Sequence, residues 1–267
     1  IQLFSQTLFE IGDQIKSLQD NGLTVIQKDD GSPVTNADLL SHDMILDYVS
    51  RFSYPIISEE GPLPSISERE TYDTYWIIDP IDGTRALIEG SSEYGISCAL
   101  INQSKPILGL LFFPALGRVY MAQPDVTDGV FLMTSPLDPF VLLDDLVIDS
   151  PSSHVRLVSN FSYAKPRLER FIQAYQLQAK VSIKTVSVAS ALKFIYLLEG
   201  KADFYPKLGP IMQWDIAAGY ALLSAVGIPF KNLDGSDLSF TPNKCRQDGF
   251  YAGHVDTVAM NLFSTLD

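Results

Sequence analysis

Hydrophobic residues near the start of the chain recur every three or four positions. The repeat is made by Phe4, Leu8, Ile11, Ile15 and Leu18. Such spacing places apolar side chains on one face of a helix, and Asn21-Gly22 supplies residues that commonly end one. The pattern predicts an amphipathic helix that ends there.

Short apolar runs between turn residues predict strands in the first half of the chain. They cover residues 23–27, 56–58, 76–79, 94–101, 107–113 and 118–122. A hairpin turn is expected between Phe113 and Arg118. The segment "GSPVTNAD" is expected to form a turn that leads into a helix, where Thr35 and Asp38 have the spacing of a capping box. This half of the chain therefore reads as a meander-rich sheet with helices.

The second half mixes one strand with several helices. The strand is expected at 155–159, and helices are expected near 167–175, 189–199 and 214–226, the last ended by Gly227. Polar and acidic residues from Asp138 to Ser153 suggest a passage between two lobes. We expect an N-terminal α+β lobe over 1–148 and a C-terminal α/β lobe over 149–267. Strand runs followed by strand and helix mixtures favour an α+β or layered α/β architecture over a purely parallel sheet.

Composition limits the classes of partner. The chain has 267 residues, is 46% hydrophobic and can bury a large core. Its 19 basic and 32 acidic residues give a net charge of −13, which argues against a nucleic-acid polymer or an anionic membrane surface as the main partner. No apolar run reaches the length of about 18 residues that spans a bilayer. An acidic protein still binds phosphates if cations intervene.

The two cysteines bear on the compartment. Cys98 and Cys245 form no C-x-x-C motif and are most simply reduced thiols of a cytoplasmic protein. The start of the chain lacks the pattern of a secretory signal, and because it begins at Ile1 we expect a few natural residues to precede it. Attachment to the inner membrane surface and the oligomeric state are left open.

The segment "WIIDPIDGT", residues 76–84, joins an apolar run to two aspartates. Pro80 and Gly83 predict a turn, so Asp79 and Asp82 are expected at the exit of a short strand. An ordinary turn and a functional site explain this segment equally well, since Asp and Gly are standard turn residues. An EF-hand is excluded, because Ile81 and Gly83 stand where that calcium loop needs alternating acids.

Acidic residues stand at the ends of several other expected elements. Asp38 and Asp215 are expected at helix starts, and Glu59-Glu60 follows a short strand. Each acid alone has a structural explanation, such as a favourable interaction with a helix dipole. Taken together they match the oxygen ligands that Mg²⁺ prefers around a phosphate. Glu60 is not counted among these ligands, and its substitution should be milder than that of Glu59 if it faces away from such a site.

Charge counting supports the metal hypothesis. The set Asp38, Glu59, Asp79, Asp82 and Asp215 would carry −5, which two or three Mg²⁺ ions would offset. Gly83 and Thr84 could then contact the phosphate where free N–H groups begin the next helix. Other catalytic arrangements find little support, because the histidines have no metal-ligand spacing and no G-x-S-x-G or Walker sequence occurs. The histidines are His42, His154 and His254.

Three segments together resemble the inositol monophosphatase superfamily of Mg²⁺-dependent, lithium-sensitive phosphatases. They are "SEEG", "WIIDPIDGT" and "WDIAAGYALLSAVG". Within that superfamily, "GSPVTNAD", "KPILGLLFFP" and "LKFIYLLEGKADFYPKLGPIMQWDIAAG" look like the bacterial 3'(2'),5'-bisphosphate nucleotidases of sulfur metabolism, which remove the 3'-phosphate of adenosine 3',5'-bisphosphate. The resemblance spans most of the chain. It implies a layered αβαβα sandwich of the inositol monophosphatase and fructose-1,6-bisphosphatase type, with metals between the lobes.

The resemblance also implies roles for individual residues. The metal ligands would be Glu59, Asp79, the carbonyl of Ile81, Asp82 and Asp215. Asp38 and Thr84 would place and activate the attacking water, so with Glu59 they form the catalytic group. Ser190, Lys193 and Lys207 match positions that hold the second phosphate of the nucleotide, while ordinary solvated lysines are the alternative for Lys193 and Lys207.

The chain departs from the sequences of these relatives at two places, and two alternative functions are also considered. The segment Ser159–Ser162 reads "SNFS" where relatives commonly have an "SRSH"-like sequence, and Lys207 stands where they usually have arginine. These changes bear on how tightly the nucleotide is held, because lysine lacks the fork of a guanidinium. The nearest alternative function is an inositol phosphate or sugar phosphate phosphatase on the same scaffold. A non-catalytic metal-binding interaction protein is a more distant one.

Overall fold

The computed structural model of the chain describes residues 2–143, 154–160 and 166–265. Within them, a large mixed sheet has the strand order β3-β4-β5-β6-β7-β8-β9. Its strands are β3 (Ile56–Ser58), β4 (Thr74–Asp82), β5 (Gly95–Asn102), β6 (Lys105–Phe113), β7 (Arg118–Ala122), β8 (Phe131–Met133) and β9 (Val141–Leu142). The first pair, β3 and β4, is parallel, and the later neighbours are antiparallel. The meander predicted from the sequence is therefore confirmed.

A smaller sheet follows in the second half, with the strand order β11-β10-β12-β16-β14 among the described residues. Its strands are β10 (His154–Ser159), β11 (Ser182–Ser187), β12 (Phe204–Lys207), β14 (Phe230–Lys231) and β16 (Phe250–Gly253). β10 runs parallel to β11 and β12, whereas β16 is antiparallel to its neighbours. Two short pairs complete the strands: β1 (Val25–Gln27) with β2 (Pro33–Thr35), and β13 (Ile211–Met212) with β15 (Arg246–Gln247).

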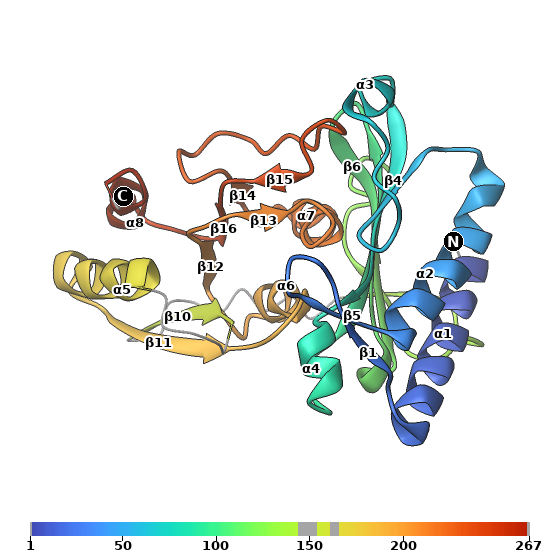
Figure 1. The fold of residues 1–267 in the computed structure, drawn as a ribbon. Coiled ribbons are helices and arrows are strands. Elements are labelled where there is room, and N and C mark those ends of the chain that lie inside the picture. The colour runs from blue at the N-terminus through green and yellow to red at the C-terminus, as the bar shows by residue number, and fades with distance from the viewer. Residues whose placement is uncertain (1, 144–153, 161–165, 266–267) are drawn as a thin grey trace.

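Helices and sheets alternate as layers (Figure 1). Helices α1 (Gln2–Asn21) and α2 (Asn36–Val49) cover the outer face of the large sheet, and α6 (Leu192–Leu198) and α7 (Ala217–Ser224) lie between the two sheets. Helices α5 (Pro166–Ala179) and α8 (Thr257–Phe263) cover the far side of the small sheet. The short helices are α3 (Ile66–Arg69), α4 (Thr84–Ile88) and the 3-10 turns η1 (Ser50–Phe52) and η2 (Pro114–Leu116). The layers confirm the expected αβαβα sandwich.

The pleat of β4 explains why both faces of the large sheet are buried. Successive side chains of a strand point to opposite faces. Trp76 and Ile78 pack with α1 and α2, whereas Tyr75 and Ile77 belong to the cluster around α6 and α7. An almost continuous apolar strand is the sequence pattern that two-sided burial requires.

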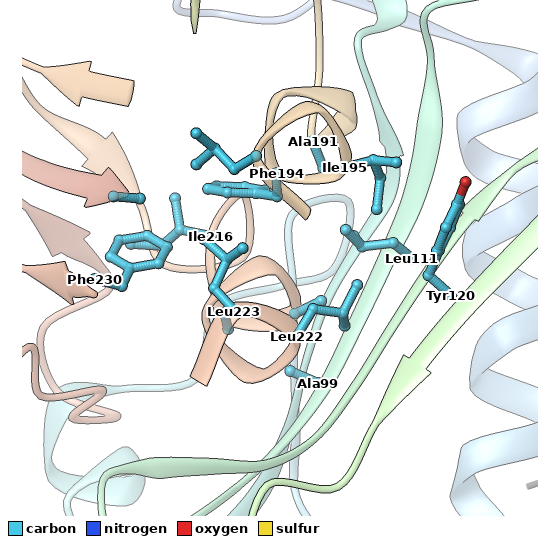
Figure 2. Close-up of a cluster of buried hydrophobic side chains, with 14 of the residues drawn as sticks. Ala99, Leu111, Tyr120, Ala191, Phe194, Ile195, Ile216, Leu222, Leu223 and Phe230 are labelled. Atoms are coloured by element: carbon cyan, nitrogen blue, oxygen red, sulfur yellow. The ribbon is translucent and has the colours of Figure 1, made fainter. Parts of the chain in front are cut away.

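The middle layer is packed closely against the large sheet. Figure 2 shows Leu222 and Leu223 of α7 and Phe194 and Ile195 of α6 within this cluster. Gly109 of β6 permits the close approach, since a Cβ there would lie 2.6 Å from the Cβ of Ala221. A larger residue at this position would have to push α7 away from the sheet.

Several expected boundaries are wrong. β4 does not end at Asp79 but continues through Pro80 to Asp82, with a shift of register against β5 between the two aspartates. Proline is tolerated at such an irregularity because the ladder hydrogen bond is already interrupted there. Helix α6 begins at Leu192 rather than Ala189, and α7 begins at Ala217 rather than Trp214.

The expected lobe boundary lies between residues 148 and 149, outside the described residues, and the division into 1–148 and 149–267 stays a prediction. In the described part of the chain, no helix combines the length and the apolar character needed to cross a membrane.

Candidate active site

Three carboxylates from separate segments meet beside the large sheet. Ligand oxygens of Glu59, Asp79 and Asp215 lie within 4.8 Å of one another. Glu59 follows β3, and its N–H donates to the carbonyl of Ile78 at 3.1 Å, which fixes it beside the end of the parallel strand β4. Parallel pairing therefore brings Glu59 and Asp79 together from positions 20 residues apart in the printed sequence.

Asp215 reaches the cluster from the segment that precedes α7. The hydroxyl of Ser97 on β5 donates to the carbonyl of Trp214 at 2.8 Å, which ties this segment to the large sheet. The N–H of Met212 donates to Oδ2 of Asp215 at 3.3 Å. Asp215 thus lies two residues before the helix that the sequence predicted it would start.

The charges in this cluster repel one another. Burial and the neighbouring carboxylates raise the pKa of Asp79 and of Asp215 well above the ordinary value of 3.8. Burial also raises the pKa of Asp82 to about 6, although Lys193 and Lys207 oppose the shift. Several buried acids that lack enough cationic partners fit a site for hard divalent cations.

Asp82 belongs to the same region, although it is outside the tightest group of three. Among the charges that raise the pKa of Asp215, Asp82 has the largest effect. Asp82, Glu59 and Asp215 also line one cavity. The structure thus brings together the four acids for which a metal-binding role was expected.

Asp38 and Thr84 are in direct contact. The Thr84 hydroxyl donates to Oδ1 of Asp38 at 2.8 Å and also lies 3.2 Å from the Ile81 carbonyl oxygen. The other carboxylate oxygen of Asp38 accepts from the Thr35 N–H at 2.8 Å and from the Thr35 hydroxyl at 2.5 Å. Thr35 in turn caps α2, which confirms the capping box. Asp38 is fully buried, so this set of bonds fixes both of its oxygens.

Ile81 and Gly83 shape the chain between these groups. The Ile81 N–H donates to Oδ1 of Asp79 at 3.0 Å. Gly83 has φ +96°, and a Cβ there would lie 3.1 Å from the Glu93 carbonyl and 3.2 Å from the Cβ of Ser190. Glycine suits both the left-handed conformation and the close approach. Thr84 begins α4, which confirms the expected helix start behind the motif.

One cavity of about 870 Å³ joins the acids to the expected substrate residues. It is lined by Glu59, Asp82, Gly83, Thr84 and Asp215, and also by Ser190, Lys193 and Lys207. These residues come from both halves of the chain. The cavity is large enough for a small phosphorylated molecule.

The two lysines have different surroundings. Lys193 is only 5% exposed, donates to the Ser190 carbonyl, lies 3.5 Å from the Val188 carbonyl, and approaches the Tyr205 ring at 5.6 Å. This burial contradicts the alternative of an ordinary solvated side chain for Lys193. Lys207 is half-buried, and burial lowers its pKa despite the opposing fields of Asp215 and Asp82. Both are cations held within a site rather than on open surface.

Sequence reasoning missed Lys28. Its ammonium group lies 3.1 Å from Glu59 and 2.7 Å from Glu60, so both glutamates share one cationic partner. Burial raises the pKa of Glu60, and Lys28 partly offsets this. Lys28 stands in the turn between β1 and β2, beside two aspartates. Nothing in this local sequence indicates that its partners are Glu59 and Glu60. Arg85, Glu93 and Arg246 also line the cavity and were not foreseen.

The "SNFS" segment borders the cavity at Asn160. Ser159 and Asn160 are described, and Asn160 lines the cavity. Residues 161 and 162 lie outside the described residues.

Comparison with known sequences identifies the family. The sequence profile described as the inositol monophosphatase family matches residues 2–261. The chain belongs to the inositol monophosphatase family. Among curated relatives, the 3'(2'),5'-bisphosphate nucleotidase CysQ of Escherichia coli K12 is 32% identical over 237 residues, covering 87% of this chain and 90% of the relative. The Salmonella typhimurium protein of the same name gives the same identity and coverage.

Solved structures of this family agree with the fold. CysQ from Bacteroides thetaiotaomicron, described as a bacterial member of the inositol monophosphatase family, superposes with a TM-score of 0.76 at 26% identity, over 93% of this chain and 94% of that one. An IMPase from Thermotoga maritima superposes with a TM-score of 0.74 at 23% identity, over 98% and 96% of the two chains. The chain therefore has the fold of a phosphatase family.

Proposed function

We propose that this member of the family is a 3'(2'),5'-bisphosphate nucleotidase that hydrolyses the 3'-phosphate of adenosine 3',5'-bisphosphate to AMP and phosphate. The observation that carries the proposal is the cavity lined by three of the acids, Glu59, Asp82 and Asp215, and by two lysines. Acids that bind divalent cations are suited to hold the 3'-phosphate, which is hydrolysed. Lysines are suited to bind the 5'-phosphate, which remains on the product. The curated relatives named as such nucleotidases support the same substrate class.

The acids are proposed to bind two or three Mg²⁺ ions through Glu59, Asp79, Asp82, Asp215 and the carbonyl of Ile81. Oxygen donors at the ends of several elements match the coordination that Mg²⁺ prefers. When bound, the ions would lower the pKa of a water and offset charge on the reacting phosphate. The raised pKa values of Asp79 and Asp215 support this, because those carboxylates are short of positive partners.

Asp38 and Thr84 are proposed to place and activate the attacking water. Since the Thr84 hydroxyl donates to Asp38 at 2.8 Å, its oxygen keeps lone pairs to accept a hydrogen bond from that water. A proton from the water can pass through the hydroxyl to the Asp38 carboxylate, which acts as general base. Thr35 holds this carboxylate in place from its other side.

Gly83 and Thr84 are proposed to contact the reacting phosphate, and Ser190, Lys193 and Lys207 to hold the other one. The protein carries a net charge of −13, so cations that attract a second phosphate must be local. Both lysines line the cavity, and Lys207 is the more available of the two because it is less buried, whereas Lys193 is directed to backbone carbonyls. A cytoplasmic location and the absence of a nucleic-acid polymer as partner stay predictions from the sequence.

An inositol or sugar phosphate phosphatase is the second candidate. The observation that favours it is the engagement of the Lys193 ammonium by the Ser190 and Val188 carbonyls, which lessens its capacity for a second anion. A substrate with one phosphate needs the acidic cluster alone. The two candidates therefore differ in whether Lys207 matters.

The test compares Lys207→Met with the natural protein on two substrates. A charge-assisted hydrogen bond to phosphate contributes about 1.5–3 kcal/mol, so kcat/KM for adenosine 3',5'-bisphosphate should fall about tenfold to a hundredfold. Turnover of inositol 1-phosphate should change little, and Lys207→Arg should match or exceed the natural protein on the nucleotide. Equal losses on both substrates would show that Lys207 serves the fold or the acidic cluster, which would contradict the nucleotidase proposal.

A further inference from the structure

Glu93 links two distant segments at the rim of the cavity. It lies between α4 and β5, and its Oε2 accepts a hydrogen bond at 2.8 Å from the backbone N–H of Ala189. Ala189 belongs to the turn formed by residues 188–191, which joins β11 to α6. Both residues line the cavity of the proposed active site. A carboxylate that binds an N–H makes a charge-assisted hydrogen bond, which is stronger than a neutral one.

The turn that Glu93 binds has an unfavourable backbone. Ser190 has φ +52°, which places a residue with a side chain in the left-handed region. Such a conformation persists only where its surroundings hold it. Gly83 packs against the same turn, and a Cβ on Gly83 would approach the Cβ of Ser190 to 3.2 Å. The 188–191 turn is therefore held by contacts with the first half of the chain.

Two charged side chains bind opposite polar groups of the turn. Lys193 donates to the carbonyl of Ser190 and lies 3.5 Å from that of Val188. Glu93 accepts from the N–H of Ala189, the residue between these two. The position of Ser190 and the direction of the Lys193 ammonium thus depend on the same short turn. Releasing its N–H would remove the bond that ties this turn to the loop before β5.

We infer that Glu93 is a positioning residue, which fixes the 188–191 turn so that Ser190 and Lys193 face the second phosphate of the substrate. This inference rests on the proposed nucleotidase function for the identity of that phosphate. Glu93 is not proposed to bind the phosphate itself, since a carboxylate would repel that anion. It acts through the Ala189 N–H.

Two substitutions separate a positioning role from an effect of charge. Glu93→Gln removes the charge but keeps an oxygen that can accept from the Ala189 N–H, whereas Glu93→Ala removes both. If the charge of Glu93 only repelled the substrate, both variants would bind the nucleotide more tightly. Glu89→Ala is a matched control, because Glu89 lines the same cavity and is exposed, with no side-chain hydrogen bond among the described contacts.

The first measurement is steady-state kinetics with adenosine 3',5'-bisphosphate and with inositol 1-phosphate. Glu93→Ala should raise KM for the bisphosphate about tenfold, the effect of losing one charge-assisted hydrogen bond, with kcat nearly unchanged. Glu93→Gln and Glu89→Ala should keep KM within about twofold of the natural protein. Equal losses on both substrates, equal losses in the alanine and glutamine variants, or no loss in either would overturn the inference.

The second measurement is hydrogen exchange of the peptide that contains residues 188–193, without substrate. Exchange should be faster in Glu93→Ala and unchanged in Glu93→Gln and Glu89→Ala, because only the first loses the acceptor for the Ala189 N–H. Unchanged exchange in Glu93→Ala would overturn the inference. If the natural protein instead fails to prefer the bisphosphate, the proposed function is contradicted, and exchange still decides whether Glu93 holds the turn.

Discussion

Asp79 and Asp215 are acids in positions where acids are costly. Asp79 is 2% exposed, and burial together with neighbouring carboxylates raises the pKa of both groups. A fold keeps such groups at some expense in stability, which points to a binding role for them. Their proposed partners are divalent cations.

Replacing Asp215 by asparagine should therefore abolish turnover without unfolding the protein. The change removes a charged ligand but no part of the apolar core, so we expect kcat/KM to fall by more than the ~10–100-fold that is typical when a residue supporting a metal ligand is changed. Far-ultraviolet circular dichroism should stay close to that of the natural protein, and the melting temperature should not fall, because the change also removes a repelling charge. Asp13→Asn is the control, since Asp13 is exposed on α1. Retained Mg²⁺-dependent activity in Asp215→Asn would contradict the metal assignment.

The acids could be predicted from the sequence because they stand close to the ends of apolar segments, although β4 continues to Asp82 and α7 begins two residues after Asp215. "WIIDPIDGT" and "SEEG" mark strand ends, and parallel pairing of β3 with β4 then brings Glu59 beside Asp79. Lys28 and Glu93 could not be found in this way. Their partners lie 31 and 96 residues away along the chain, and no local pattern encodes such a contact.

At the scale of elements, the start of α2 links helix formation to the site. Thr35 accepts from the N–H groups of Ala37 and Asp38, and donates through its own N–H and hydroxyl to the Asp38 carboxylate. The same residue thus satisfies the helix terminus and orients the proposed general base.

Thr35→Ala should reduce both stability and catalysis. Losing an N-cap side chain costs about 0.5–2 kcal/mol, and Asp38 also loses one of the donors that orient it. We expect a lower midpoint of urea unfolding and a lower kcat, whereas Thr35→Ser should keep most of both because it retains the hydroxyl. If kcat were unchanged in Thr35→Ala while stability fell, the orientation of Asp38 by Thr35 would not matter for the reaction.

The elements predicted best were those with strong periodicity and clear ends. Helix α1 and strands β5 to β7 match their apolar patterns closely. Strand β4 was predicted to end at Asp79, because Pro80 reads as a break, yet the register shift against β5 lets the strand continue to Asp82. Only β10 of the small sheet was predicted, and β11, β12, β14 and β16 were missed, since they are defined by pairing with distant segments.

At the scale of the whole molecule, the acidic cluster couples folding to pH. The pKa of Asp82 is raised from 3.8 to about 6, and those of Asp79 and Asp215 are raised in the same direction. Between pH 3.8 and about pH 6, the folded protein therefore binds more protons than the unfolded chain. Stability of the metal-free protein therefore falls as pH rises through this window, and the loss persists at higher pH.

In the presence of a chelator, Asp79→Asn should raise the melting temperature at pH 7.5 and have little effect at pH 4. The substitution removes one of the charges that repel at neutral pH, whereas the raised pKa values of Asp79, Asp82 and Asp215 leave less charge to repel at pH 4. A gain of a few degrees is expected, since about 1 kcal/mol shifts the melting temperature of a protein this size by roughly 2–4 °C. Thermal unfolding at both pH values checks this. A lower melting temperature of Asp79→Asn at pH 7.5 would contradict mutual repulsion in the cluster.

The most direct test of the whole account is the product formed from adenosine 3',5'-bisphosphate with and without Mg²⁺. Phosphorus NMR distinguishes loss of the 3'-phosphate from loss of the 5'-phosphate. We predict adenosine 5'-monophosphate and inorganic phosphate with Mg²⁺, formed with a higher kcat/KM than phosphate from inositol 1-phosphate, and no turnover after exhaustive chelation. Full activity without divalent cations, or loss of the 5'-phosphate instead of the 3'-phosphate, would contradict the assignment of the acidic cluster as the site of reaction.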